Sequence, residues 1–186
     1  MSYPAQVTRE KILARSVALI EKKGELSLQE LARSLGIRAP SLYRYFDSRE
    51  RLIAAVGLAG FRKLAGYIRS TTRHDPSLRA AACAIRRFAK KHPTLYRVMN
   101  ESDARHEDPQ EAREVTREVL TAAFGERVPD DTIPTLGATL TAIRAFIHGF
   151  AMLEISGQFQ DERHLDKSFE AGLDALLAAF EKQLRT

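Results

Sequence analysis

The 186-residue chain has a single cysteine, Cys83, and no tryptophan. One cysteine excludes a disulfide within the chain, so the composition favours a reducing compartment, and we expect the cytoplasm. The sequence also lacks a run of about 18 apolar residues that could cross a membrane. Its first residues, MSYPAQVTREK, do not have the basic-then-apolar layout of an export signal. These absences predict a soluble protein that stays where it is made.

The chain also lacks the patterns by which many enzymes are recognised. Its ten glycines are dispersed singly, so no glycine-rich loop is available to cradle a phosphate. No nucleophile stands beside a base, and Cys83 lies next to an apolar stripe where packing is its simplest role. An acidic loop offers metal-capable atoms without a recognised ligand spacing, on Glu101, Asp103, His106, Glu107 and Asp108. We therefore predict no catalytic residue, no metal and no cofactor.

Strand-type alternation is almost absent, and apolar residues recur at the helical spacings of three and four. The seven prolines fall mostly between such segments. This pattern predicts an all-α fold of about nine helices, with an N-terminal three-helix unit and a larger C-terminal helical body. The expected helices cover about residues 8–23, 28–35, 40–46, 47–73, 76–92, 93–99, 109–124, 132–157 and 164–184.

Residues 26–50, LSLQELARSLGIRAPSLYRYFDSRE, have the pattern of a helix-turn-helix. Ser27 and Glu30 stand at the spacing of a capping box, in which a hydroxyl and a carboxylate satisfy free backbone donors at a helix start. Gly36 follows where the chain must turn sharply. We therefore predict a short helix that begins near Leu28 and ends before this glycine.

The second helix of the motif carries side chains suited to DNA. Pro40 is favoured as a first helical residue because its missing N–H would have no partner there. Leu42 and Phe46 supply an inward face. The remaining side chains are rich in hydrogen-bond donors and lie in the half of the helix that enters a major groove in such motifs, namely Arg38, Ser41, Tyr43 and Arg44, with Arg49 following. A charged surface hairpin is the alternative interpretation.

The charge distribution favours the DNA-binding interpretation. Residues 1–73 hold 14 Lys and Arg against 6 Asp and Glu, a balance of +8. Residues 74–186 hold 15 against 18, a balance of −3. A basic first part joined to an acidic second part is typical of a nucleic-acid module attached to a body that should not bind phosphate.

The last two predicted helices carry long apolar stripes. Pairing them with a second copy into a four-helix bundle would bury these stripes in a two-fold dimer. The predicted interface consists of Leu136, Leu140, Ile143, Ile147, Phe169, Leu173, Leu176 and Phe180.

Aromatic and apolar residues of the middle helices could converge on a cavity for a small hydrophobic molecule, although each could equally be plain core. The candidates are Phe88, His92, Tyr96, Met99, Phe146, Phe150 and Met152. His148 could be a ligand contact, a pH-sensitive group or a hydrogen-bonded core histidine, and the core interpretation is favoured. Glu154 lies in an apolar helix, where a carboxylate needs a partner such as Arg97.

With these residues identified, the chain resembles the TetR family of bacterial transcriptional regulators, all-helical dimers with an N-terminal helix-turn-helix and a ligand-responsive body. The likeness is strongest over about residues 8–56, where LARSLGIRAPSLYRYFDSRERL is similar to the family's signature. The resemblance implies that Tyr43 and Arg49 contact phosphates and that Ser27 and Gln29 lie near the DNA backbone. It further implies that base edges are faced by Arg38, Ala39, Pro40, Ser41 and Arg44.

The second half resembles a TetR C-terminal subtype whose signature is a tryptophan four residues before a His-Gly pair. His148-Gly149 and the segment HPTLYRVMN match that subtype, whereas Arg144 stands where the tryptophan is expected. The resemblance here implies dimerisation and an effector pocket without identifying the effector.

Together these observations predict a ligand-responsive, sequence-specific DNA-binding transcriptional regulator. The expected domains are a helix-turn-helix domain over residues 1–50 and an effector-binding and dimerisation domain over residues 51–186. The leading hypothesis is a homodimeric repressor that a small hydrophobic effector releases from a pseudo-palindromic double-stranded DNA operator, with no membrane partner. A structural DNA-binding protein without sequence preference and a helical enzyme are the alternatives.

Overall fold

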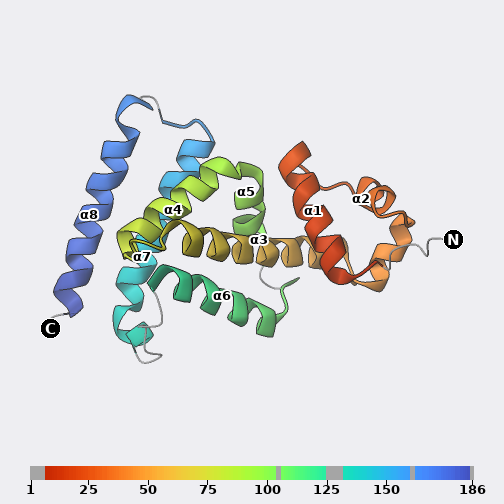
Figure 1. Cartoon of the computed structure of the whole chain (residues 1–186), viewed down its shortest axis with the longest axis horizontal. Coiled ribbons are helices and arrows are strands. Elements are labelled where there is room, and N and C mark those ends of the chain that lie inside the picture. The colour runs from red at the N-terminus through yellow and green to blue at the C-terminus, as the bar shows by residue number, and fades with distance from the viewer. Residues whose placement is uncertain (1–6, 104–105, 125–131, 160–161, 185–186) are drawn as a thin grey trace. The chain divides into compact units, whose positions relative to one another are not determined.

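The computed structural model describes residues 7–103, 106–124, 132–159 and 162–184, with the backbone alone for residues 124, 132–137, 139, 162, 180 and 182–184. These residues contain helices and no strand, which confirms the predicted all-α fold (Figure 1). The elements are α1 (Arg9–Lys23), α2 (Leu28–Ser34), the 3₁₀ helix η1 (Ala39–Arg44), α3 (Arg49–Thr71), α4 (Leu78–Lys91), α5 (Pro93–Glu101), α6 (Pro109–Phe124), α7 (Thr132–Ile155), the 3₁₀ helix η4 (Glu162–His164) and α8 (Leu165–Leu184).

Local signals in the sequence set the ends of α1. The Thr8 hydroxyl accepts a hydrogen bond from the Lys11 N–H at 3.3 Å, which satisfies a free donor of the first turn. Gly24 ends the helix with a φ of 87°, a left-handed conformation that glycine adopts without strain, and its N–H donates to the Ile20 carbonyl. Helix α4, in contrast, begins two residues later than predicted, because the Ser77 hydroxyl caps it by accepting from the Ala80 N–H.

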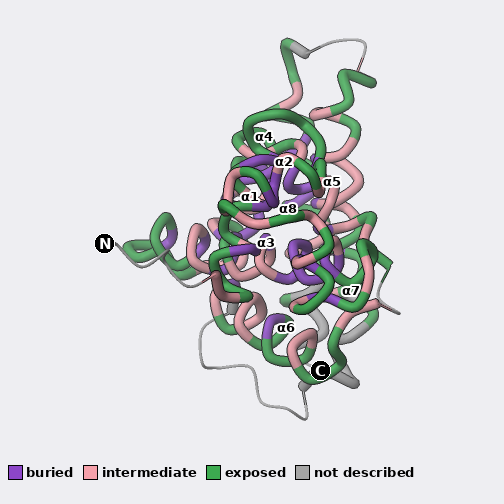
Figure 2. The backbone as a smooth tube through the Cα atoms, turned by 90° about the vertical axis from the view of Figure 1, so that its right-hand side faces the viewer, coloured by how far each residue is buried: buried purple, intermediate pink, exposed green. Residues whose placement is uncertain are grey.

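The chain divides into two compact units, one formed by residues 1–63 and 92–117 and the other by residues 64–91 and 118–186. Helices α3 and α6 run from the first unit into the second. In the first unit, α1 packs against α2 and α5, and α2 packs against η1. In the second unit, α7 packs against α4 and α8. Buried positions, purple in Figure 2, occur along α3 in both units, for example Val56 and Ile68.

The core of the second unit contains four of the eight residues predicted for the dimer interface. Ile143, Ile147, Phe169 and Leu173 are buried together with Ala82 of α4. The single chain already covers these side chains, so their assignment to a contact between copies is corrected to intrachain core. Leu140 and Leu176 are only partly buried. The side chains of Leu136 and Phe180 lie outside the described residues.

Candidate nucleic-acid interface

The start of α2 is capped by one half of the predicted capping box. The Ser27 hydroxyl accepts from the Glu30 N–H at 3.4 Å, as predicted. The Glu30 carboxylate accepts from the Lys23 ammonium instead of reaching back to Ser27. This hydrogen bond with Lys23 lowers the pKa of Glu30. The ion pair joins the end of α1 to the start of α2, while Ser27 and Gln29 stay exposed.

The turn after α2 forms a hydrogen-bonded helix stop. Gly36 has a φ of 69°, in the left-handed region. The Gly36 N–H donates to the Arg33 carbonyl at 3.2 Å, and the Ile37 N–H donates to the Ala32 carbonyl at 3.0 Å. These two bonds are those of a Schellman motif, in which a glycine lets the chain reverse direction while the last carbonyls remain satisfied. The prediction of a sharp turn at Gly36 is confirmed.

The second helix of the motif, η1, is a 3₁₀ helix of six residues that begins at Ala39. The Ser41 N–H donates to the Arg38 carbonyl, and the Tyr45 N–H donates to the Leu42 carbonyl, both at 2.9 Å. Leu42 is buried, as is Phe46 just beyond the end of η1. Because these two apolar side chains are buried in the first unit, the polar side chains on the opposite face of η1 are turned to solvent.

The residues predicted to contact DNA are mostly at the surface. Ser27, Gln29, Arg38, Pro40, Tyr43, Arg44 and Arg49 are exposed, whereas Ala39 and Ser41 are half-buried. Half of the Tyr43 surface is accessible, which is unusual for so large an aromatic side chain. The guanidinium groups of Arg38 and Arg44 make no hydrogen bond or ion pair with another described residue. This surface therefore offers aromatic and cationic groups that are available to a partner.

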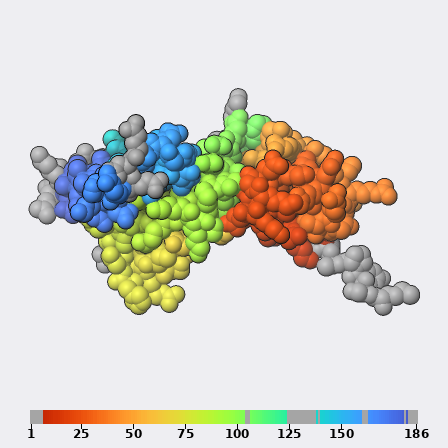
Figure 3. Space-filling model, turned by 90° about the horizontal axis from the view of Figure 1, so that it is seen from above, coloured from red at the N-terminus to blue at the C-terminus, as the bar shows by residue number. Residues whose placement is uncertain are grey.

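The surface around η1 is continuous with that of α1. In the space-filling view, the red atoms of α1 merge with the orange atoms of the helix-turn-helix (Figure 3). Tyr45 does not belong to the exposed face, because its hydroxyl donates to the Val7 carbonyl at 2.9 Å. Arg9 stacks over the Phe46 ring, with its guanidinium carbon 4.5 Å from the ring centroid. The first turn of α1 thus holds the C-terminal end of η1, a role the sequence did not indicate for Arg9.

The residues predicted to line an effector pocket take part in packing. In the first unit, His92 pairs with Glu21 through an Nδ1–Oε1 distance of 2.6 Å, while Tyr96 and Met99 are buried. In the second unit, Phe88 is fully buried and meets Tyr67 edge-on, with 5.7 Å between ring centroids.

The other three predicted pocket residues lie on α7. Phe146 stacks on Phe169 with 5.5 Å between ring centroids, and Phe150 meets Phe169 edge-on at 5.1 Å. Met152 is half-buried. Among the predicted pocket residues, the aromatic rings of Phe146 and Phe150 are half-buried, so each offers apolar surface that solvent can still reach.

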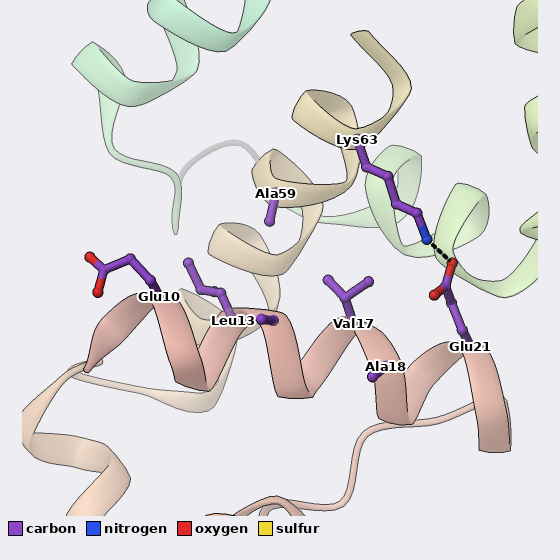
Figure 4. Close-up of a pocket in the computed structure, with 8 residues that line it drawn as sticks. Glu10, Leu13, Val17, Ala18, Glu21, Ala59 and Lys63 are labelled. Carbon is purple, nitrogen blue, oxygen red and sulfur yellow. Dashed lines mark hydrogen bonds and ion pairs between the residues drawn. The ribbon is translucent and has the colours of Figure 1, made fainter. Parts of the chain in front are cut away.

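An open hollow of about 490 Å³ lies in the first unit between α1 and α3 (Figure 4). Leu13 and Val17 point from α1 toward Ala59 of α3, and Lys63 pairs with Glu21 at one end. None of the predicted pocket residues lines this hollow. It is an open groove along α1 and α3.

Glu154 finds a different partner from the one predicted. Its carboxylate accepts from Arg86 through two hydrogen bonds of 2.7 and 2.8 Å and from Lys90 at 2.7 Å, so the suggested pairing with Arg97 is wrong. Burial by itself raises the pKa of Glu154, but the hydrogen bonds from Arg86 and Lys90 outweigh it and lower that pKa. Arg86 also lies over the rings of Phe150 and Phe169. The result is an ion pair built into the core of the second unit.

Two other polar residues, His148 and Cys83, are partly buried in the second unit. The pKa of His148 is lowered by burial and by the nearby charge of Arg144, both of which disfavour the protonated imidazole. Cys83 packs against the hydrophobic core of the second unit. Within the described part of the chain, no cluster of His, Cys, Asp or Glu side chains is suited to hold a metal ion. No described helix has the length and apolarity needed to span a membrane.

Two family models match the sequence. The model described as "Bacterial regulatory proteins, tetR family" matches residues 12–56, and the one described as "Tetracyclin repressor-like, C-terminal domain" matches residues 78–176. The chain is also 27% identical over 173 residues to an uncharacterized HTH-type transcriptional regulator of Mycobacterium tuberculosis, covering 85% of this chain and 75% of that protein.

Solved structures share the fold. A TetR variant from Acinetobacter baumannii in complex with minocycline gives a TM-score of 0.68 at 19% identity, covering 97% of this chain and 99% of that chain. BioQ with its double-stranded DNA operator gives a TM-score of 0.60 at 21% identity, covering 94% and 98%. At these identities the likeness establishes the architecture.

Proposed function

Because the chain belongs to the TetR family of bacterial DNA-binding transcriptional regulators, we propose that it is a homodimeric repressor that a small hydrophobic effector releases from a pseudo-palindromic operator. Family membership makes it a regulator rather than an enzyme. The cytoplasm is the compartment in which it would meet its operator.

The proposal rests on the difference in solvent exposure between the apolar and polar side chains of η1 and its flanking residues. Leu42 and Phe46 are buried, while Tyr43 and the guanidinium groups of Arg38 and Arg44 face solvent. Arginine can donate two hydrogen bonds to a guanine edge in the major groove, which gives sequence preference. In the proposed complex, Arg38, Ala39, Pro40, Ser41 and Arg44 face base edges. The backbone would be contacted by Ser27, Gln29, Tyr43 and Arg49.

The proposed dimer places two copies of η1 in successive major grooves, about 34–36 Å apart. The last two long helices, α7 and α8, remain the elements through which the copies pair, by way of side chains that one chain leaves accessible. Leu140 and Leu176 are the described residues of the original set that meet this condition. A two-fold arrangement explains why the operator should be pseudo-palindromic.

The proposed effector site lies in the helical body within residues 51–186, the predicted effector and dimerisation domain. Phe146 and Phe150 are half-buried aromatic residues there, and they offer apolar surface to a hydrophobic molecule. One structural neighbour was solved with minocycline, which supports the proposed effector site, and another with its DNA operator, which supports the proposed DNA binding. Effector and DNA would oppose each other through a coupling free energy of about 1–3 kcal/mol.

Selection from randomised DNA duplexes tests the proposal. The purified protein is expected to enrich a pseudo-palindromic sequence whose half-sites are centred about one helical turn, or a multiple of it, apart. Sedimentation should show two copies of the chain in solution and two or a multiple of two on the enriched duplex. Enrichment of no sequence would favour the structural DNA-binding alternative, and enrichment of a single half-site by a monomer would refute the dimer.

A further inference from the structure

The C-terminal end of η1 is held from outside the helix-turn-helix. The Arg9 guanidinium carbon lies 4.5 Å from the centroid of the Phe46 ring, and Arg9 Nη1 donates to the Tyr45 carbonyl at 3.5 Å. The Tyr45 hydroxyl donates to the Val7 carbonyl. A short 3₁₀ helix has poor hydrogen-bond geometry, so its conformation depends on such external contacts.

Arg9 is in turn held by the start of α6. Its Nη2 lies 3.5 Å from Oε2 of Glu111, whose other carboxylate oxygen accepts from Arg62 of α3 at 2.7 Å. All of these residues belong to the first unit, although Arg9 and Glu111 are 102 positions apart in the sequence. Glu111, in the first turn of α6, therefore contacts both α1 and α3.

The position of Glu111 is set by a well-capped helix start. The Asp108 carboxylate accepts from the N–H groups of Gln110 and Glu111 at 3.0 and 2.9 Å. The hydrogen bond from the Glu111 N–H lowers the pKa of Asp108 despite a partial loss of solvation. The nearby positive charges of Arg9 and Arg51 lower that pKa further. The start of α6 thus presents two carboxylates, those of Asp108 and Glu111, to arginines of the first unit.

We propose that Glu111 and Arg9 are positioning residues for DNA recognition: Glu111 orients Arg9, and Arg9 fixes the end of η1 and thereby the direction of Tyr43 and Arg44. This inference rests on the proposed contacts of η1 with DNA. Neither Glu111 nor Arg9 needs to touch the operator. Through Arg9, the start of α6, a helix that continues into the second unit, is linked to the C-terminal end of η1.

The sign of a charge change separates this role from simple electrostatics. Glu111→Gln removes a negative charge from a protein that binds a polyanion, so long-range electrostatics alone predicts equal or tighter DNA binding. Loss of positioning predicts weaker binding. Glu114→Gln is the matched control, because Glu114 lies one turn further along α6, is exposed, and accepts from Gln110 at 3.2 Å.

The experiment measures operator affinity by fluorescence anisotropy for the wild type, Glu111→Gln, Arg9→Ala, the double variant and Glu114→Gln, each at several salt concentrations. Glu111→Gln is expected to weaken operator binding about two- to fivefold, the range that a partly exposed ion pair supports. Glu111→Gln should add little to the loss that Arg9→Ala causes, because Glu111 acts on η1 only through Arg9. Binding by Glu111→Gln as tight as that of Glu114→Gln, or fully additive losses, would overturn the proposal.

A measurement without DNA keeps the inference separate from the proposed function. Amide hydrogen exchange at Tyr45 and Phe46, whose N–H groups donate to the Leu42 carbonyl, should be faster in free Glu111→Gln than in free Glu114→Gln. Equal exchange rates would refute the positioning role even if the operator is found. A wild type that selects no operator would refute the proposed function, while the exchange comparison would still decide whether Glu111 holds the end of η1.

Discussion

Glu154→Ala is expected to destabilise the second unit by removing one partner of a buried ion pair. The side chains of Arg86 and Glu154 are each only 9% exposed and are joined by two short hydrogen bonds. Removing one partner of such a pair typically costs about 3–5 kcal/mol, because the remaining charge stays buried. Asp166 lies 2.9 Å from Arg86 but is 85% exposed, so it offsets little of the lost interaction. We therefore expect a loss of about 3 kcal/mol in the free energy of unfolding.

Urea denaturation followed by far-UV circular dichroism measures this loss. With a slope of about 2 kcal/mol per molar urea, the transition midpoint should fall by about 1.5 M. The double variant Arg86→Met/Glu154→Leu should unfold within about 1 kcal/mol of the wild type, since apolar residues can replace a buried ion pair at little cost. Asp174→Ala, which breaks an exposed pair with Arg79, is the control and should change stability by less than about 0.5 kcal/mol.

The double variant separates the cost of an unpaired buried charge from the stability that the ion pair itself supplies. If the cost of Glu154→Ala comes from leaving Arg86 buried without its main partner, removing both charges must recover most of the loss. A double variant at least as unstable as Glu154→Ala would show that the pair itself, and not the unpaired charge, supplies the stability. A loss below about 1 kcal/mol in Glu154→Ala would show that Arg86 is solvated in the folded protein.

Acid unfolding, DNA sequence preference and packing at Gly60 can each be tested by a single substitution. The pKa of Glu154 is lowered in the folded protein. Its contribution to stability is therefore complete above the usual carboxyl pKa of about 4.3 and is lost as the pH falls through the lower pKa of the folded state. In acid unfolding experiments, Glu154→Gln should lack the loss of stability that comes from protonating Glu154. Arg44→Ala should relax the preference at one base pair by about 1–3 kcal/mol. Arg49→Ala should instead weaken binding to all duplexes and reduce the slope of log affinity against log salt concentration by about one. Equal losses on operator and random DNA for Arg44→Ala would refute its role in base recognition. A Cβ on Gly60 would clash with Met99 Cγ, so Gly60→Ala should cost about 1–3 kcal/mol in a thermal or urea unfolding experiment. An unchanged midpoint would show that the methionine side chain moves freely.

Features that depend on neighbouring residues could be predicted from the sequence. The helix stops at Gly24 and Gly36 need a left-handed residue within one turn of the helix end, and both glycines adopt it. The same holds for the Ser27 cap. The helical character of η1 was predicted, but its 3₁₀ geometry was not, because Leu42 and Phe46 are too few apolar positions to distinguish one helix type from another over six residues.

Long-range partners could not be predicted in the same way. Apolar periodicity identified a buried face on α7 and α8, but it could not show that α4 of the same chain covers Ile143 and Phe169. Glu154 clearly needed a cation, yet the pattern gave no reason to choose Arg86, 68 residues away, over Arg97. The predicted DNA contacts are compatible with the exposure of Arg44 and Tyr43, and they remain predictions until a complex is measured.

In the proposed function, the exposed face of η1 selects a particular DNA sequence, and a ratio of two dissociation constants tests that selectivity. At about 150 mM salt, the wild-type protein should bind its enriched duplex at least about a thousandfold more tightly than a scrambled duplex of the same composition. Arg44→Ala should reduce that ratio without abolishing binding. Equal affinities of the wild type for the two duplexes would contradict the claim.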